Sequence, residues 1–316
     1  MELNFEEGVD LLRQILEFGD PLPQLILTGG DPLQRADLYE LIDEARNFGI
    51  GVSITPAATP ALTRDVLVKL KAHGVEGLGL SLDGSNAVRH DSIRGVPGTF
   101  DRTVHAMRWA RELEMPLQVN TLVSAETAGD VPAIYELLKA VEVTRWSLFF
   151  LISVGRGKVL QPLSPEEGEG LMGWIYETSL AAPFTVATTE APSYRRVALE
   201  RMRADGLTGE QVKRSSSYRS FGIRDGHGIM FVSNTGDICP AGFLPLVVGN
   251  VRKDRVAAVY RHAPIFQSLH DPTQLEGRCG VCEYHALCGG SRARAFEATG
   301  NPLASDPFCT YQPASN

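Results

Sequence analysis

The chain has 316 residues, of which 43% are hydrophobic and 22% charged, a composition typical of a globular protein with a large core. Its 30 basic and 38 acidic side chains give a net charge of −8, the opposite of what a nucleic-acid backbone attracts. No run of about 18 apolar residues predicts a membrane span. The acidic start is typical neither of a secretory signal nor of a transit peptide. We therefore expect a cytoplasmic protein that binds neither nucleic acid nor membrane.

The first two thirds of the chain alternate helix-like and strand-like segments. In the former, apolar residues recur at helical spacing, and in the latter, short apolar runs are bounded by turn residues. In chain order, we expect helices at 5–18, 38–45, 62–73, 100–113, 131–141 and 164–180, and strands at 25–27, 51–55, 77–82, 117–123, 146–152 and 184–188. This alternation predicts an α/β fold with a parallel sheet covered by helices, and both a partial barrel and an open sheet fit the spacing.

The last third of the chain differs in composition. Residues 205–227 are rich in Gly, Ser, Arg and Asp, which predicts a linker or mobile loop. Residues 228–316 contain short hairpin-like pieces and all five cysteines. We therefore divide the chain into a barrel-like part at 1–204, a linker at 205–227 and a small second domain at 228–316.

Four of the cysteines are close together in sequence. Cys279-Gly-Val-Cys282 places two thiols on one tight turn, and Cys288 and Cys309 follow. An odd number of cysteines, clustered at one end, is a poor disulfide framework. Four thiolates bind Zn²⁺ or hold a [4Fe-4S] cluster, and the uneven spacing favours iron–sulfur over zinc and over four buried structural cysteines. Cys239 fits a small buried thiol at least as well as a ligand.

Glycines and polar residues recur where the predicted strands end. Gly29 and Gly30 follow the strand at 25–27, and paired glycines let a backbone approach a ligand closely. The sequence around them is neither a dinucleotide fingerprint nor a P-loop. Because α/β folds bind ligands at the carboxyl ends of parallel strands, we take residues near these ends as candidate contacts. They are Gly29, Gly30, Asp31, Pro32, Ser81, Asp83, Asn120 and Gly155.

Two further groups of polar residues fit ligand binding, but they also fit ordinary solvent-exposed side chains without a ligand. Asp83 is suited to bind ligand hydroxyls and Arg94 a carboxylate or phosphate, but a solvated loop with an Asp–Arg pair fits slightly better. Tyr194, Arg195 and Arg196 are candidate contacts for a substrate carboxylate, and a solvated helix start is the preferred interpretation of these three.

Together these features resemble the radical S-adenosylmethionine (SAM) enzymes of the SPASM-domain type, over essentially the whole chain. Gly29-Gly30-Asp31-Pro32 is similar to the family's Gly-Gly-Glu-Pro loop, with Asp31 in place of Glu. The segment 81–95 and the pattern Cys279-x2-Cys282-x5-Cys288, followed by two glycines, carry the rest of the resemblance. It implies a partial (β/α) barrel that lacks its first strand, followed by a small C-terminal SPASM-like iron–sulfur domain.

The resemblance also implies residue roles. The loop at 29–32 would hold the amino group of SAM, and Asn120 with the loop 154–157 would contact its ribose and adenine. We expect no second auxiliary cluster, because only Cys239 remains near its ligands and Arg292 stands where some members carry a cysteine. The implied ligands of one auxiliary [4Fe-4S] cluster are Cys279, Cys282, Cys288 and Cys309.

One family motif is missing. The Cys-x3-Cys-x2-Cys loop, which holds the cluster that cleaves SAM, has no counterpart, because no cysteine precedes Cys239 and only 28 residues precede Gly29. The SAM-cleaving [4Fe-4S] cluster, which would be a second cluster beside the auxiliary one, is expected only if that upstream loop exists. We expect a truncated reading of a longer enzyme rather than a protein that lost catalysis, because the helix predicted from residue 5 would follow the missing strand.

In complete form, such an enzyme would cleave SAM to a 5′-deoxyadenosyl radical that abstracts hydrogen from a peptide or tetrapyrrole substrate. An electron donor such as ferredoxin or flavodoxin would serve it. Two alternatives stay open: a non-catalytic iron–sulfur scaffold, and a zinc-stabilised barrel enzyme. Against the latter, the seven histidines are scattered, and only His285 lies inside the cysteine cluster.

Overall fold

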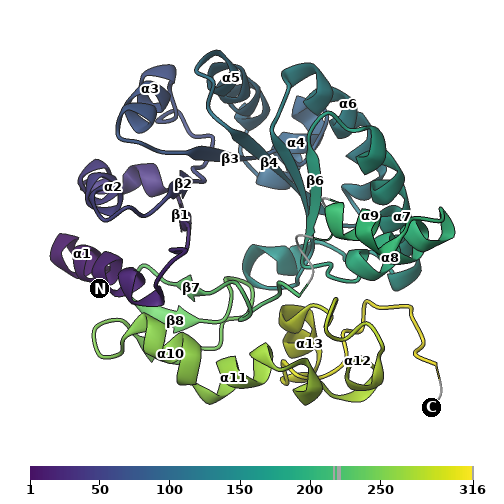
Figure 1. Cartoon of the computed structure of the whole chain (residues 1–316). Coiled ribbons are helices and arrows are strands. Elements are labelled where there is room, and N and C mark those ends of the chain that lie inside the picture. The colour runs from purple at the N-terminus through teal and green to yellow at the C-terminus, as the bar shows by residue number, and fades with distance from the viewer. Residues whose placement is uncertain (216–217, 219–221, 315–316) are drawn as a thin grey trace.

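The computed structural model describes residues 1–215, 218 and 222–314. Its main feature is a six-stranded sheet whose strands pair in chain order, every pair parallel. Figure 1 shows this sheet curving through the molecule with helices along its outer side. The strands are β1 (Leu25–Leu27), β2 (Val52–Ile54), β3 (Gly77–Ser81), β4 (Leu117–Val123), β5 (Arg145–Phe150) and β6 (Thr185–Thr189). The predicted α/β fold with a parallel sheet is confirmed, whereas the missing first strand stays a prediction.

Each helix predicted from apolar spacing is present. These six are α1 (Phe5–Ile15), α2 (Leu38–Asn47), α3 (Arg64–Ala72), α5 (Thr99–Glu112), α6 (Val131–Val141) and α7 (Pro165–Ala181). In this part of the chain, sequence reasoning missed α4 (Ala87–Arg94) and α9 (Gly209–Arg214), and of α8 (Tyr194–Ala204) it gave only the start. Short 3₁₀ turns are η1 (Leu16–Phe18), η2 (Pro32–Gln34), η3 (Ala128–Asp130), η4 (Gly155–Val159) and η6 (Pro272–Gln274). No described helix is long and apolar enough to cross a membrane.

The two faces of the sheet differ in chemistry because side chains alternate along each strand. In β4, Leu117, Val119 and Val123 are buried against the outer helices, together with Trp146 of β5. The intervening residues are only partly buried, and they lie on the inner face. The outer face therefore supplies the main core and leaves the inner face to carry polar side chains.

The C-terminal part of the chain lies across the open side of the sheet, between α1 and α8 (Figure 1). Its strands form a small antiparallel sheet with the order β7-β8-β9. The elements are β7 (Phe231–Val232), β8 (Asp237–Cys239), β9 (Gly249–Asn250), α10 (Val256–His262), α11 (Pro264–His270), α12 (Gly277–Val281) and α13 (Arg292–Thr299). The N-terminal segment joins this part, since the Leu3 amide donates to the Asn234 carbonyl at 2.8 Å and Leu3 packs with Ile238 and Phe266.

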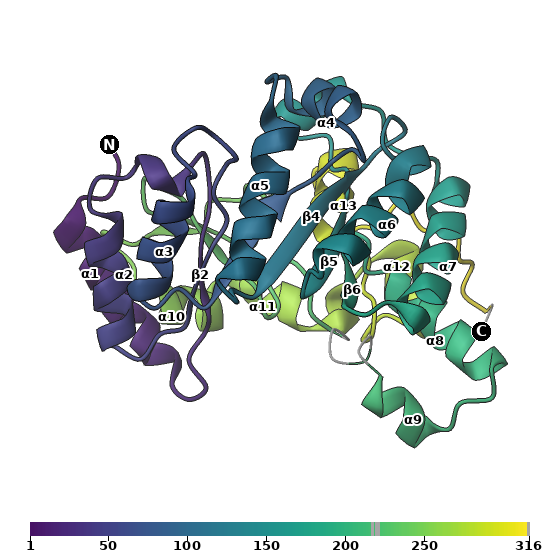
Figure 2. The same cartoon turned by 90° about the horizontal axis from the view of Figure 1, so that it is seen from above.

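The range 205–227, which the sequence predicts as a linker or mobile loop, contains helix α9. Figure 2 shows α9 at the periphery of the molecule, beyond α8. Five residues of the range, 216–217 and 219–221, lie outside the described residues. The SPASM-like character of residues 228–316 and the domain boundaries stay predictions.

A close contact sets the position of the last cysteine relative to the sheet. Phe308 packs against α7 at Gly168, where a Cβ atom would lie 2.1 Å from the Phe308 ring. The same ring meets Phe150 of β5 edge-on, with centroids 5.8 Å apart. Because Phe308 immediately precedes Cys309, helix α7 and strand β5 together fix where the Cys309 thiol lies.

Candidate functional site

The loop after β1 is open on the side that a ligand would approach. Gly29 has φ +120°, and nothing lies within 4 Å of where a Cβ would stand on Gly29 or Gly30. Asp31 then caps η2, accepting from the Leu33 amide and from the Thr59 hydroxyl, both at 3.2 Å. Both donors are neutral, so the Asp31 carboxylate keeps its charge for a cationic group such as an ammonium.

Ser81 and Asn120 are brought together by strand register. They are direct partners across β3 and β4, and Asn120 is in turn the partner of Ser147 in β5. The Gln118 amide donates to Asn120 Oδ1 at 2.7 Å, and Ser147 Oγ lies 3.1 Å from the Thr189 hydroxyl of β6. These residues form a polar row on the inner face. Sequence reasoning noted Thr189 at the end of its strand but missed Ser147, although the alternation of Ser147 with apolar neighbours was a usable signal.

Asp83 pairs with Arg94, as the favoured interpretation expected, but Asp83 is buried rather than in a solvated loop. Its side chain is 3% exposed, and Oδ2 lies 2.8 Å from Arg94 Nε. Its Oδ1 accepts from the Leu122 amide at 2.7 Å. The segment around Arg94 is helix α4, which packs so closely that a Cβ on Gly84 would lie 2.4 Å from the His90 amide. Asp83 therefore holds α4 against β4, and a direct contact of Asp83 with a ligand stays a prediction.

The remaining candidate, Gly155, opens η4 just beyond β5. It is exposed, has φ +54°, and has open space where a side chain would stand. Because β1, β3, β4 and β5 are parallel, the loops that follow them share one edge of the sheet. The structure thus places seven of the eight predicted contacts at or just beyond this edge, whereas Asn120 lies inside β4, in register with Ser81.

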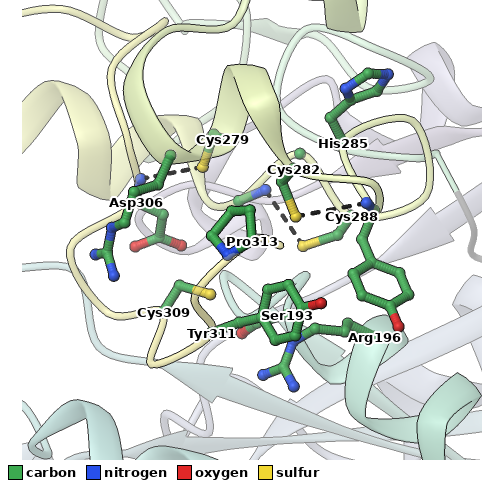
Figure 3. Close-up of a pocket in the computed structure, with 14 residues that line it drawn as sticks. Ser193, Arg196, Cys279, Cys282, His285, Cys288, Asp306, Cys309, Tyr311 and Pro313 are labelled. Carbon is green, nitrogen blue, oxygen red and sulfur yellow. Dashed lines mark hydrogen bonds between the residues drawn. The ribbon is translucent and has the colours of Figure 1, made fainter. Parts of the chain in front are cut away.

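Four of the five cysteines line one small open pocket, with a cavity volume of about 30 Å³. They are Cys279, Cys282, Cys288 and Cys309, and Figure 3 shows them around this space together with Arg196, Tyr311 and Pro313. Cys239 is buried in β8 and is not part of the lining. The structure therefore brings together the four thiols that the sequence grouped. Among the described residues, no three His, Cys, Asp or Glu side chains are grouped for a single metal ion.

Backbone amides point at three of these sulfur atoms. Asp306 N donates to Cys279 Sγ, Tyr284 N to Cys282 Sγ and Gly290 N to Cys288 Sγ, each at 3.4 Å. Such donors stabilise thiolates, whereas burial raises the pKa of Cys288 to about 12 and also raises that of Cys309. A strongly cationic ligand is what deprotonates such thiols at neutral pH. Four converging thiols with amide donors fit a [4Fe-4S] cluster, whose properties such hydrogen bonds tune.

A buried pair of carboxyl groups joins the end of β6 to the C-terminal part. Glu190 has φ +57° and accepts from the Ser291 hydroxyl at 2.6 Å. Asp225 accepts from the first two amides of α13, Arg292 N at 3.1 Å and Ala293 N at 3.0 Å. Burial, and the proximity of the two groups, raises the pKa of Glu190. The pair therefore retains a proton near neutral pH.

The start of α8 is buried, which contradicts the solvated helix start that the sequence favoured. Tyr194, Arg195 and Arg196 are 3%, 9% and 4% exposed. The Arg196 guanidinium forms ion pairs with Glu169 at 2.6 Å and Glu200 at 2.8 Å. Sequence reasoning failed here because the start of α8 is covered by distant parts of the chain: Arg196 reaches Glu169 of α7 and lies over the Tyr311 ring, 5.0 Å from its centroid. Local pattern does not reveal such contacts.

Comparison with known proteins identifies the family. A model described as the Radical SAM superfamily matches residues 1–138. The AdoMet-dependent heme synthase of Methanosarcina barkeri is 35% identical over 312 residues, 99% of this chain and 88% of that protein. The PqqA peptide cyclase of Rhodopseudomonas palustris is 25% identical over 99% of this chain and 80% of its own.

The fold agrees with this assignment. The crystal structure of Streptococcus suis SuiB bound to S-adenosylmethionine matches with a TM-score of 0.73 at 16% identity, over 97% of this chain and 70% of that one. The chain belongs to the radical SAM superfamily, so this part of the predicted resemblance is confirmed. Its SPASM part stays a prediction.

Glu190→Gln is expected to remove a pH dependence of stability. Burial raises the Glu190 pKa from 4.5 to about 8, so the folded chain binds a proton that the unfolded chain releases. Wild-type stability therefore falls as pH rises through that window. Glutamine cannot ionise, so the variant should gain stability relative to wild type between about pH 5 and about pH 8.5, measured by thermal unfolding. The control Glu297→Gln, on the exposed side of α13, should show no such gain, and parallel profiles for all three proteins would contradict the assignment.

Proposed function

We propose that this chain binds SAM at the edge of its parallel sheet, holds one auxiliary [4Fe-4S] cluster, and takes part in hydrogen abstraction from a tetrapyrrole side chain. The observation that carries the proposal is the gathering of four thiols in one pocket of a radical SAM superfamily chain. The sheet edge and the pocket are joined through Glu190 and Ser291, so a single rigid frame would hold both cofactors.

The auxiliary cluster would be held by Cys279, Cys282, Cys288 and Cys309. When bound, such a cluster exchanges single electrons at a potential set by its surroundings. The chain's own contribution is the set of amide donors to sulfur and the shielding of Cys288, which is 9% exposed. Both favour a stable, partly water-excluded site.

SAM would be oriented by residues at the sheet edge. The Asp31 carboxylate and the open backbone of Gly29 and Gly30 suit an ammonium group, and Ser81 and Asn120 offer hydrogen bonds to ribose hydroxyls. The Gly155 turn would contact adenine. Because the first 238 residues contain no cysteine, thiols for a SAM-cleaving cluster are not among the residues of this chain at that edge.

Two observations support a tetrapyrrole over a peptide as the substrate class. The relative at 35% identity is named a heme synthase, whereas the peptide cyclase reaches only 25%. On the inner face, Phe149 of β5 lies beside Phe243, with ring centroids 6.4 Å apart, and Ile26 of β1 is 57% exposed. A flat macrocycle stacks well on such surfaces. We further propose a ferredoxin or flavodoxin as the electron donor and the cytoplasm as the location.

Removing one thiol should destabilise the auxiliary cluster. Cys282→Ala is expected to lower the iron content and the visible absorption of anaerobically reconstituted protein, because the iron atom that loses its thiolate becomes labile. Cys239→Ala, which removes a buried thiol outside the pocket, should keep both. Iron content and absorption spectra measure this. Zinc in place of iron in the wild type would favour the zinc-stabilised barrel, and unchanged iron in Cys282→Ala would rule out the ligand assignment.

Asp31→Ala is expected to weaken SAM binding about 10- to 100-fold, the loss typical of one charged hydrogen bond. Calorimetric titration of the chain measures it. Methylthioadenosine, which lacks the amino and carboxyl groups, serves as the control ligand and should bind wild type and variant equally. A variant that loses both ligands would indicate a collapsed loop, and one that loses neither would place the amino group elsewhere.

A propionate-bearing iron porphyrin should bind the chain saturably, with a shift of its Soret band. Phe149→Ala should weaken that binding about tenfold, because one stacking surface is lost. Phe48→Ala, which changes a half-buried ring at the end of α2 on the outer side, should have no effect. Unsaturable binding, or equal affinities in all three proteins, would count against a tetrapyrrole and favour a peptide or a scaffold role.

A further inference from the structure

Buried positive charge is concentrated around the cysteine pocket. Among the described residues, nine Asp and Arg side chains are buried, and five of these are arginines. All five lie on α8, on α13 or on the segment that precedes β7. They are Arg195, Arg196, Arg224, Arg292 and Arg294. Two have carboxylate partners: Arg196 pairs with Glu169 and Glu200, and Arg294 lies 3.5 Å from Asp306.

Arg292 is the most extreme case, because its side chain is completely buried. Its guanidinium donates to three backbone carbonyls, those of Gly290 at 3.2 Å, Pro302 at 2.8 Å and Ala304 at 2.7 Å. Its fourth contact is from Nη2 to Cys279 Sγ at 3.6 Å. Carbonyls satisfy its hydrogens but leave its charge uncompensated. Since arginine stays protonated in proteins and an unpaired buried charge costs several kcal/mol, the site needs an anion.

Gly290 shows how tightly this contact is built. It has φ +66°, which favours glycine, and a Cβ atom there would lie 2.6 Å from Arg292 Nη2 and 3.2 Å from Cys279 Sγ. The backbone thus leaves room for the guanidinium to reach the sulfur. The contact is a feature of the local fold rather than a chance approach of a mobile side chain.

Arg195 and Arg224 add a second, independent observation. Neither has a carboxylate within 4.0 Å among the described residues, and Arg195 Nη1 and Arg224 Nε lack hydrogen-bond partners there. Burial lowers the pKa of Arg195 to about 10, with the charge of Arg224 adding to that effect. Arg224 also packs against the turn after Cys288, because a Cβ on Gly289 would lie 3.0 Å from its Cδ. Two neighbouring buried cations without a partner again call for an anion.

The excess charge matches the proposed cofactor. With Arg294 and Arg196 paired, three buried guanidinium groups remain. They face one negative charge on the proton-sharing pair Glu190 and Asp225, and Arg224 also interacts with the partly buried Asp271 carboxylate. The excess of positive charge is therefore between about one and two. A [4Fe-4S] core of charge +2 with four thiolates carries −2, and one-electron reduction takes it to −3.

We infer that Arg195, Arg224 and Arg292 form a buried cationic shell that balances the charge of the auxiliary cluster and favours its one-electron reduction. This inference rests on the cluster proposed above. Arg292, which contacts the Cys279 sulfur, is a positioning residue as well as a counter-charge. Because the shell lies in a low-dielectric interior, its effect on the cluster far exceeds that of a solvent-exposed arginine at similar distance.

The test compares reduction potentials of buried and exposed arginine variants in the reconstituted full chain. Arg292→Gln should lower the midpoint potential, measured by reductive titration with EPR detection, by at least about 59 mV, a tenfold change for one electron. Arg278→Gln removes an arginine from the lining of the same pocket that is only partly buried, and it should shift the potential by less than half as much. Iron-loaded Arg292→Gln with the wild-type potential would overturn the inference.

Stability provides a readout that does not need the potential. Arg292→Met leaves three carbonyls without their donor in both states, so the change in the midpoint of thermal unfolding is compared between iron-free and iron-loaded protein. The midpoint should fall more in iron-loaded than in iron-free protein, because only the loaded protein loses a counter-charge. An equal or smaller fall in the loaded protein would overturn the inference. If Arg292 variants do not hold iron, the midpoint potential is measured in Arg195→Gln and Arg224→Gln instead, and each should again fall by at least about 59 mV. A wild-type chain that binds no iron would contradict the proposed function itself.

Discussion

A charge that leaves water needs a partner, and the interior of this chain is arranged around that constraint. At the sheet edge, Asp83 meets Arg94 at 2.8 Å and thereby fixes α4 on the ends of β3 and β4. After β6, the last strand of the sheet, the carboxyl groups of Glu190 and Asp225 share a proton and so avoid carrying two negative charges. Among the described residues, three buried arginines near the thiols, Arg195, Arg224 and Arg292, have no carboxylate within 4.0 Å. This buried positive charge is the basis on which we place an anionic cofactor there.

A chain of hydrogen bonds connects the end of β6 to the thiol of Cys279. The Ser291 hydroxyl donates to Glu190 at the end of β6, and the Ser291 amide donates to Asp306 at 2.7 Å. The Asp306 amide in turn donates to Cys279 Sγ at 3.4 Å. This continuous path ties Cys279, a proposed cluster ligand, to the sheet edge that carries the loop at 29–32, for which we propose SAM binding. The distance between the two sites is therefore set by the rigid sheet rather than by a flexible linker.

Sequence alone predicted those parts of the protein that local pattern encodes. The strands and the six main helices follow from apolar periodicity, and the grouping of four thiols follows from their spacing. Helix α4 was missed because its only buried residue is His90, so its sequence shows no apolar residues at helical spacing. The polar row through Ser147 depends on which strands are neighbours and in what register they pair. Neither can be predicted from the pattern within one strand.

The roles of the arginines could not be predicted, because they depend on contacts between distant parts of the chain. In sequence, Arg195 and Arg196 look alike, two basic residues at the start of a polar helix. In the fold, Arg196 reaches Glu169 of α7 and Glu200, whereas Arg195 turns into the interior beside Arg224, 29 positions further along the chain. Arg292 stands where the family resemblance suggested a lost cysteine ligand. Its contact with Cys279 supports the role that we propose for this position, a counter-charge to the neighbouring cluster in place of a metal ligand.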